Sequence, residues 1–177
     1  MKNNKDTSSG VLRALAGGIA GAVTVTLIHE TMRRLLPDAP RMDVLGMRAL
    51  AKGLNKANQP VPEKDALHTW TLAGDIVANS LYYSLTGSGK NAWTKGAVLG
   101  LAAGVGGVVL PGPLGLGEAP SNRTPQTQAM TVAWYLLGGL AAAATVKLLS
   151  CNYCSPAKSK TGKWIEEDVD NIMGVIV

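Results

Sequence analysis

Apolar residues gather in three long stretches of the chain, and charged residues are crowded between them. Residues 14–28, 96–117 and 124–146 contain no charged side chain. A helix rises about 1.5 Å per residue, so roughly 20 apolar residues cross the ~30 Å hydrocarbon core of a bilayer. Helices of soluble proteins instead alternate polar and apolar faces. The pattern therefore predicts an all-α integral membrane protein.

We expect four transmembrane helices, made of the three apolar stretches and one more polar segment. Their predicted bounds are residues 11–28, 66–85, 93–110 and 129–149. Residues 1–150 would form a small four-helix domain, followed by a short polar and amphipathic tail over 151–177. Aromatic residues lie near several of the helix ends, where interfacial aromatic belts occur: Trp70, Tyr82, Tyr83, Trp93, Trp134 and Tyr135.

Basic residues bear on the orientation of these helices, because cytoplasmic flanks of membrane proteins are enriched in lysine and arginine. With four spans, nine of the 17 basic residues lie on the side of the two termini and eight on the other side. This small difference favours both termini in the cytoplasm, and dual insertion is the alternative. We read the first apolar stretch as an uncleaved helix and expect the protein in the cytoplasmic membrane of a bacterium.

Small residues recur at helical spacing within three of the predicted spans. They are Gly17 and Gly21, then Gly96, Gly100 and Gly104, then Gly139 with Ala143. Lipid does not drive apolar helices together, so small residues promote association by letting two backbones approach closely. We expect these GxxxG-like stripes to pack the bundle internally, and homodimerisation through one of them is the alternative.

The second predicted span carries a polar stripe with an acid near its middle. The residues of this stripe fall on one helical face: His68, Thr71, Asp75, Asn79 and Tyr82. An ionisable group at the centre of a bilayer costs roughly 3 kcal/mol on insertion scales, and it is usually paired, protonated or functional. Asp75 is therefore either a neutral group hydrogen-bonded to a neighbouring helix, or a titrating acid that contacts a proton or a solute.

Further polar residues should meet at one membrane face, because the predicted topology brings their segments together with His68. They are His29, Glu30, Glu118 and Arg123. Ordinary surface polarity, a polar vestibule above Asp75 and a metal site are the three interpretations. Histidine and carboxylate are zinc ligands, but the segment HETMR lacks the second histidine of an HExxH motif. We predict neither a metal nor a cofactor.

The first loop contains a predicted basic amphipathic helix over residues 42–56. Such a helix beside a span is typical of the membrane interface, where its basic face meets anionic headgroups. The basic residues are Arg41, Arg48, Lys52 and Lys56. Docking of this helix on the bundle is the alternative. The third loop is rich in proline and glycine, and we expect it to be irregular and to cap the same end.

The tail begins with the CxxC pair Cys151 and Cys154. This spacing alone is a weak signal, because zinc sites need two further ligands. Inert thiols and acylation sites beside the membrane are the alternatives. Residues 164–177 predict a short amphipathic helix that packs on the membrane, the bundle or a partner.

No motif of a nucleotide-binding or hydrolytic enzyme occurs in the chain, so we expect no enzymatic activity. The net charge of +5 lies at the membrane flanks and does not indicate nucleic-acid binding. Two functions remain. One is a structural, assembly or envelope-maintenance role with Asp75 as a packing group. The other is a small-solute or proton-linked carrier with Asp75 as its working acid.

Overall fold

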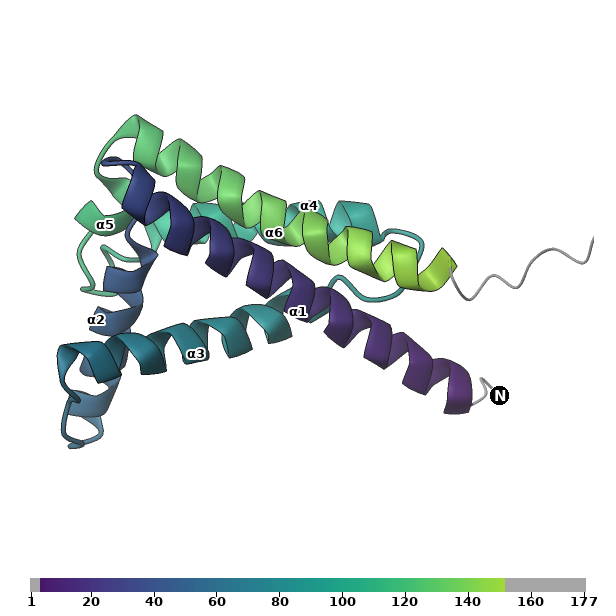
Figure 1. The fold of residues 1–177 in the computed structure, drawn as a ribbon, viewed down its shortest axis with the longest axis horizontal. Helices are drawn as coiled ribbons and strands as arrows, with labels where there is room; N and C mark the ends of the chain where they lie inside the picture. Colours follow the sequence, from purple (N-terminus) through teal and green to yellow (C-terminus); the bar gives the residue numbers. More distant parts are fainter. Residues whose placement is uncertain (1–3, 152–177) are drawn as a thin grey trace, which may run out of the picture.

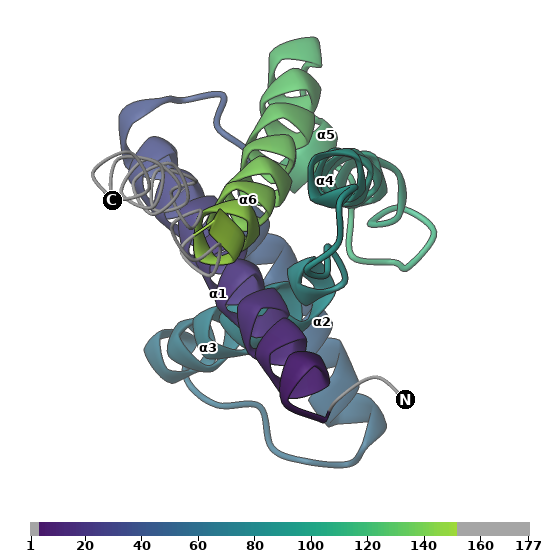
Figure 2. The same cartoon turned by 90° about the vertical axis from the view of Figure 1, so that its right-hand side faces the viewer.

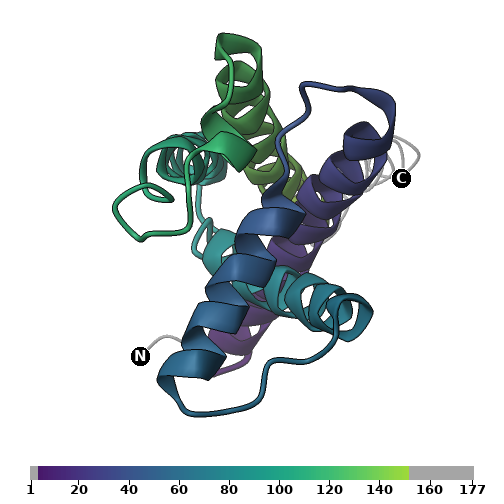
Figure 3. The same ribbon diagram turned by 90° about the vertical axis from the view of Figure 1, so that its left-hand side faces the viewer.

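The computed structural model of the chain describes residues 4–151, which form six helices and no strand. In chain order these are α1 (Asn4–Leu35), α2 (Met42–Lys56), α3 (Lys64–Ser84), α4 (Ala92–Val109), α5 (Ala119–Asn122) and α6 (Pro125–Cys151). The four longest helices, α1, α3, α4 and α6, run along the long dimension of the molecule, and α2 lies across one end (Figure 1). Figure 3 faces this end, which α2, α5 and residues 110–118 cover; we call it the capped end. The all-α prediction is confirmed.

Three of the described helices are long and apolar enough to cross a membrane. The segments are Ser8–Leu35 in α1, Ala92–Val109 in α4 and Pro125–Ser150 in α6. They indicate a membrane protein. α3, the remaining predicted span, is not among them, because polar residues such as His68, Asp75 and Asn79 lower its hydropathy although its length suffices.

α1 is longer than the charge-free window predicted. It continues through His29 and Glu30 to Leu35, so both residues lie on a helix and not in a loop. A charge-free window marks only the part of a helix that meets hydrocarbon, and a helix that extends into the interface outlasts it.

α6 begins earlier than predicted, at Pro125, which suits the start of a helix because the first N–H groups there lack helical partners. As a result Trp134 lies more than two turns inside the helix and is only 8% exposed. The prediction of an interfacial position is wrong for this tryptophan. Trp70 and Trp93 are exposed near the starts of α3 and α4.

α4 lies along α6 with glycine at the points of closest approach. A Cβ atom on Gly100 would lie 2.7 Å from the backbone of α6, and one on Gly104 would lie 2.6 Å from it. Gly96 and Gly139 face each other so closely that neither leaves room for a Cβ atom. Real Cβ atoms do not approach within 3.0 Å, so any side chain here would force the two helices apart.

α6 also contacts α1, and Figure 2 shows α6 beside both α1 and α4. A Cβ atom on Gly17 would lie 2.9 Å from the carbonyl oxygen of Ala142, and one on Gly21 would lie 2.7 Å from that of Gly138. These contacts use a second face of α6. The result is a close-packed group of α1, α4 and α6.

α3 joins this group at a different place. α1 and α3 cross closely at Gly18, where a side chain would meet the backbone of Ser80 and Ser84. From this crossing the two helices diverge toward the capped end, and α2 lies across the wide end of the wedge between them (Figure 1).

α2 spans Met42–Lys56 as predicted. Its Arg48 and Lys52 donate hydrogen bonds of 2.7 and 2.6 Å to backbone carbonyl oxygens of the loop that follows α4. Gly115 and Gly117 of that loop have φ of +65° and +84°, a backbone conformation that favours glycine. Two residues of the predicted basic face therefore dock on the bundle, and α2 caps it through this loop.

Candidate functional site: a polar pocket between α1, α2 and α3

The polar face of α3 turns toward α1 and α2 and lines a small pocket. α3 contributes His68, Thr71, Asp75 and Asn79, which share a face because three or four residues separate each from the next. Other helices supply the remaining polar and aromatic lining: Thr26, His29, Glu30, Asp43 and Tyr135. The pocket has a volume of about 30 Å³. A cavity needs roughly 10–15 Å³ to hold a water molecule, so this polar pocket is large enough for water.

Tyr82, the fifth residue of the predicted stripe, does not join this pocket. Its hydroxyl donates a hydrogen bond of 3.0 Å to the carbonyl oxygen of Leu99 in α4. The long side chain therefore reaches across to a different helix. The neighbouring Tyr83 is fully buried and donates to the carbonyl oxygen of Tyr135 at 2.8 Å.

The Asp75 carboxylate has neither a hydrogen bond nor an ion pair with another residue in the part of the chain that the structure describes. The carboxylate is half-buried and lies against α2, where a Cβ atom on Gly46 would come within 3.3 Å of its Oδ2. A packing role for Asp75 would call for a hydrogen-bond donor or a cation on a neighbouring helix. The contacts of Asp75 are instead van der Waals contacts and the open pocket.

His29 lies on the α1 side of the pocket and is held in a fixed orientation. Its ring centroid is 5.1 Å from that of Trp134 and 5.4 Å from that of Tyr135. Its Nδ1 lies 2.9 Å from the carbonyl oxygen of Val25. A carbonyl oxygen only accepts hydrogen bonds, so Nδ1 carries a proton, and Nε2 is the nitrogen that gains and loses one.

Two buried polar atoms on this lining have no partner among the described residues. One is Nε2 of His29 and the other is the hydroxyl oxygen of Thr71. Leaving such a group unsatisfied costs about 1–3 kcal/mol, so native proteins avoid it. His29 and Thr71 both line the polar pocket, whose volume suffices for bound water.

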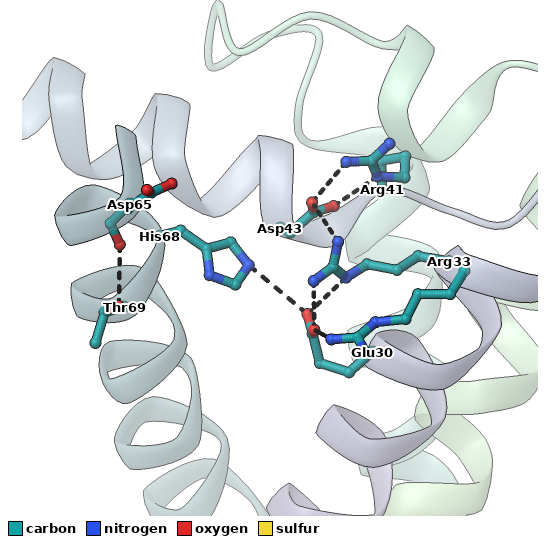
Figure 4. Close-up of polar contacts among 8 residues, drawn as sticks. Glu30, Arg33, Arg41, Asp43, Asp65, His68 and Thr69 are labelled. Atoms are coloured by element: carbon teal, nitrogen blue, oxygen red, sulfur yellow. Dashed lines mark hydrogen bonds and ion pairs between the residues drawn. The ribbon is translucent and has the colours of Figure 1, made fainter. Parts of the chain in front are cut away.

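An ion-pair network connects α1 and α2 on the side of the pocket toward the capped end (Figure 4). Arg33 donates hydrogen bonds of 2.9 and 2.6 Å to the two carboxylate oxygens of Glu30, and Arg34 lies 3.8 Å from the same carboxylate. Arg41 donates two bonds of 2.9 and 2.8 Å to Asp43. Arg33 lies 3.7 Å from Asp43 and so links the two pairs.

Asp43 is the best-enclosed acid of this network, with a side chain 5% exposed. Burial alone would raise the pKa of its carboxyl, but the hydrogen bonds and charge of Arg41, the N–H of Val44 and the charge of Arg33 together hold the pKa below its usual 3.8. Asp43 therefore stays charged and fastens the start of α2 to the end of α1.

His68 brings α3 to the same network. Figure 4 shows its ring pointing from α3 toward Glu30, with Nε2 3.9 Å from the glutamate Oε1. The contact is an ion pair only when the ring is protonated. A more exposed cleft of about 280 Å³ lies outside the pocket and shares Asp43 and His68 with it.

The structure does not bring the other two predicted rim residues into this network. Arg123 donates to the carbonyl oxygen of Pro37 and to the carboxylate of Asp38. The Glu118 carboxylate covers Gly112, where a Cβ atom would lie 2.5 Å from it. Both residues belong to the capped end, but they fasten its loops.

Sequence reasoning missed Asp43 and Tyr135 as residues of the site. An acid in the first turn of a helix is favoured by the helix dipole alone, so Asp43 gave no signal of a contact with α1. Tyr135 was assigned to the membrane interface because α6 was expected to begin later.

No group of three or more His, Cys, Asp or Glu residues within 4–151 is placed to hold a metal ion. Cys154 and the tail lie outside the described residues, and α6 ends at Cys151.

No protein family, curated protein or solved structure matches the chain.

Proposed function

We propose that the chain is an integral membrane protein with four transmembrane helices, of which α3 is the fourth. With 21 residues, α3 is about 30 Å long. Its outer face exposes Trp70, Val77 and Leu81, which are 66%, 60% and 59% exposed. A helix that exposes apolar residues and turns its polar residues inward has the inverse of the soluble pattern. That inversion supports a surrounding of lipid.

The proposed bundle is held together by close backbone contacts at glycine. In lipid, association of helices depends on van der Waals packing and weak hydrogen bonds, which close approach favours. The glycines at the contacts of α6 with α4 and α1 support this arrangement: Gly17, Gly21, Gly96, Gly100, Gly104 and Gly139.

Four spans place the two termini on the face opposite the capped end. We propose that the termini lie in the cytoplasm of a bacterial cell, on the side with slightly more basic residues. α2 then lies in the outer interface of the cytoplasmic membrane. Its exposed Arg48, Lys52 and Lys56 are available to anionic headgroups there, and Arg41 pairs with Asp43.

The activity that the pocket supports best is reversible proton binding by Asp75 in a proton-linked carrier or conduit. One observation carries this proposal: a half-buried acid faces a polar pocket and has neither a hydrogen bond nor an ion pair in the described part of the chain. A volume of about 30 Å³ suits water and protons better than an organic solute.

The lining supplies groups for proton transfer from the capped end. Glu30 and His68 lie toward the outside, and His29 offers Nε2 to the interior. A proton received by this nitrogen forms the imidazolium. Its transfer through a pocket water to the Asp75 carboxylate restores the neutral ring and leaves a neutral acid, and the reverse steps return it. Each transfer conserves the proton and makes or breaks no other bond.

Asp75→Asn tests this activity, because asparagine keeps the size and the hydrogen bonding of the side chain but cannot exchange a proton. Purified protein is reconstituted into vesicles that contain a pH-sensitive dye, and decay of an imposed pH gradient is followed. We expect wild-type protein to speed the decay and Asp75→Asn to return it to the rate of empty vesicles, with an unchanged melting temperature. Asp38→Asn is the matched control, since Asp38 lies on the exposed side of the capped end. Equal rates for Asp75→Asn and wild type would refute the activity.

A structural or assembly role in the envelope is the second candidate, and the glycine contacts along α6 favour it. Rigid, closely packed helices suit a scaffold that binds other membrane proteins. In this role Asp75→Asn would still complement a deletion strain. Gly100→Leu, which separates α4 from α6, would not. Complementation of a deletion strain by the two variants distinguishes the candidates. Neither candidate is an enzyme.

A further inference from the structure

A second hollow lies between α3 and α4 beneath α2, and it opens onto the surface of the bundle. We call it the apolar groove; its volume is about 570 Å³. α4 lines it with Ala102, Ala103, Gly106 and Gly107, and α3 with Ala78, Asn79 and Tyr82. The small side chains of α4 leave the space open.

The described residues that line the groove include no charged side chain. Its volume lies within the roughly 300–1,000 Å³ of typical sites for small ligands. Between two proposed spans, such a groove faces the acyl chains of the bilayer. A hydrocarbon chain suits its volume and its mostly apolar lining.

Two cations lie at the capped end of the groove, where Leu114 and Leu116 form its lining. Lys52 Nζ donates to the carbonyl oxygen of Leu114 at 2.6 Å, and Arg48 Nη1 donates to that of Leu116 at 2.7 Å. A carbonyl oxygen does not neutralise a cation, and neither residue has an ion pair with a carboxylate among the described residues. Both are exposed and keep further N–H donors.

We propose that the apolar groove holds an acyl chain of an anionic phospholipid whose phosphate is bound by Arg48 and Lys52. Arginine and lysine both bind phosphate oxygens, and arginine does so with two parallel hydrogen bonds. The inference rests on the proposed insertion of the helices in a bilayer. Met42, Asn79 and Tyr135 line the groove and the polar pocket alike, so the bound chain would cover the pocket from the lipid side.

Native mass spectrometry measures the retained lipid directly. Protein is reconstituted in vesicles of equal amounts of phosphatidylglycerol and phosphatidylcholine and then extracted in mild detergent. We expect wild-type protein to retain one phospholipid and to prefer phosphatidylglycerol. Gly106→Leu should fill the groove and remove the bound lipid. A Cβ atom on Gly106 meets only the end of the Leu110 side chain, at 3.4 Å, so this variant should fold. Gly74→Leu is the control, because nothing lies within 4 Å of a Cβ atom at Gly74.

The headgroup assignment has its own variants. Arg48→Gln combined with Lys52→Gln should leave the amount of retained lipid unchanged but remove the preference for phosphatidylglycerol. Glutamine still donates a hydrogen bond to the loop carbonyl oxygens. Lys64→Gln, at the exposed start of α3 and outside the lining of the groove, should keep the preference.

Each other outcome overturns the inference. Lipid retained by Gly106→Leu as by wild type, no preference of the wild type for phosphatidylglycerol, or a dimer without bound lipid would each do so. Resistance to extraction by alkaline carbonate is measured in parallel. Protein that carbonate releases would overturn the proposed insertion as well, whereas inserted protein that retains no lipid overturns this inference alone.

Discussion

α4 and α6 lie together along their length, whereas α1 and α3 cross closely and then diverge. In the first pair Gly96, Gly100 and Gly104 place a glycine at successive turns of one face. In the second pair Gly18 permits the crossing, and Thr71 and Asp75 occupy the α3 face farther along. Two helices pack closely where small residues repeat along the contact face. They diverge where polar side chains occupy that face.

This difference assigns different tasks to the two pairs. The α4–α6 pair has no room for an added side chain at its contacts, so it is suited to act as a rigid support. The wedge between α1 and α3 contains the polar pocket, and the network of Glu30, Arg33 and Asp43 holds it at the capped end. Polar groups are placed in the part of the bundle that has space for water.

Gly100→Leu should have the largest effect on stability. A Cβ atom at this position would lie 2.7 Å from the backbone of α6, which cannot move as a flexible side chain can. Overpacking of this kind costs about 3 kcal/mol or more. The melting temperature in detergent, followed by circular dichroism, should fall by many degrees. Gly74→Leu lies in open space within α3, where the helix favours leucine over glycine, so it should melt no lower than the wild type; a similar loss in both variants would mean that leucine itself is the cause.

Asp43→Asn should come next, with a loss of about 2 kcal/mol, because it removes the buried partner of Arg41 and Arg33. Since Arg41 is 45% exposed, solvent screening keeps the loss below that of a fully buried pair. Chemical denaturation in detergent measures the difference. A loss no larger than that of Asp38→Asn, an exposed acid of the same end, would show that the network does not hold α2.

The contribution of Asp43 should depend on pH with a defined sign. Its pKa in the folded protein lies below the usual 3.8, so folding favours the charged carboxylate. The contribution is present above pH 3.8 and is lost as the pH falls through the lower folded value. The melting temperatures of wild type and Asp43→Asn should therefore differ at neutral pH and converge in strong acid. A gap that grows on acidification would contradict the network.

The sequence carried information on helices and their faces, but little on which helices diverge. Glycines four residues apart point to close contact whatever the partner, and α2 has a hydrophobic period and two flanking prolines, Pro40 and Pro60. The polar stripe of α3 was readable up to Asn79 for the same reason. Tyr82 departs from it because a long side chain reaches a neighbouring helix that no periodicity describes. The link between Arg33 and Asp43 depends on the turn between α1 and α2, which spacing alone does not fix.

Gly117→Ala should have a smaller effect, a loss of about 1 kcal/mol. Its φ of +84° strains any residue with a Cβ atom, and that atom would lie 2.6 Å from Arg48 Nη1. The arginine can move, which limits the cost. Gly53→Ala in α2 is the matched control with the opposite sign, since it meets nothing within 4 Å and alanine favours the helix. Equal shifts of melting temperature in the two variants would argue against docking of α2 on this loop.

Thr71→Val should have the smallest effect on the melting temperature. The sign of this effect decides whether the polar pocket between α1 and α3 contains water. Valine keeps the shape of threonine, including the methyl group that packs against Gly46, but replaces the buried hydroxyl. If that hydroxyl has no partner at all, its removal relieves a desolvation cost and stabilises the protein. If it binds pocket water, its removal costs up to about 1 kcal/mol. We expect the second result, a slightly lower melting temperature, together with slower decay of the pH gradient in vesicles.

Thr71→Ser is the control. It keeps the hydroxyl and loses the methyl group, so it should lower the melting temperature without slowing the decay of the pH gradient. A Thr71→Val protein that is more stable than wild type and conducts equally well would show that the pocket is dry and that protons do not reach Asp75 through it.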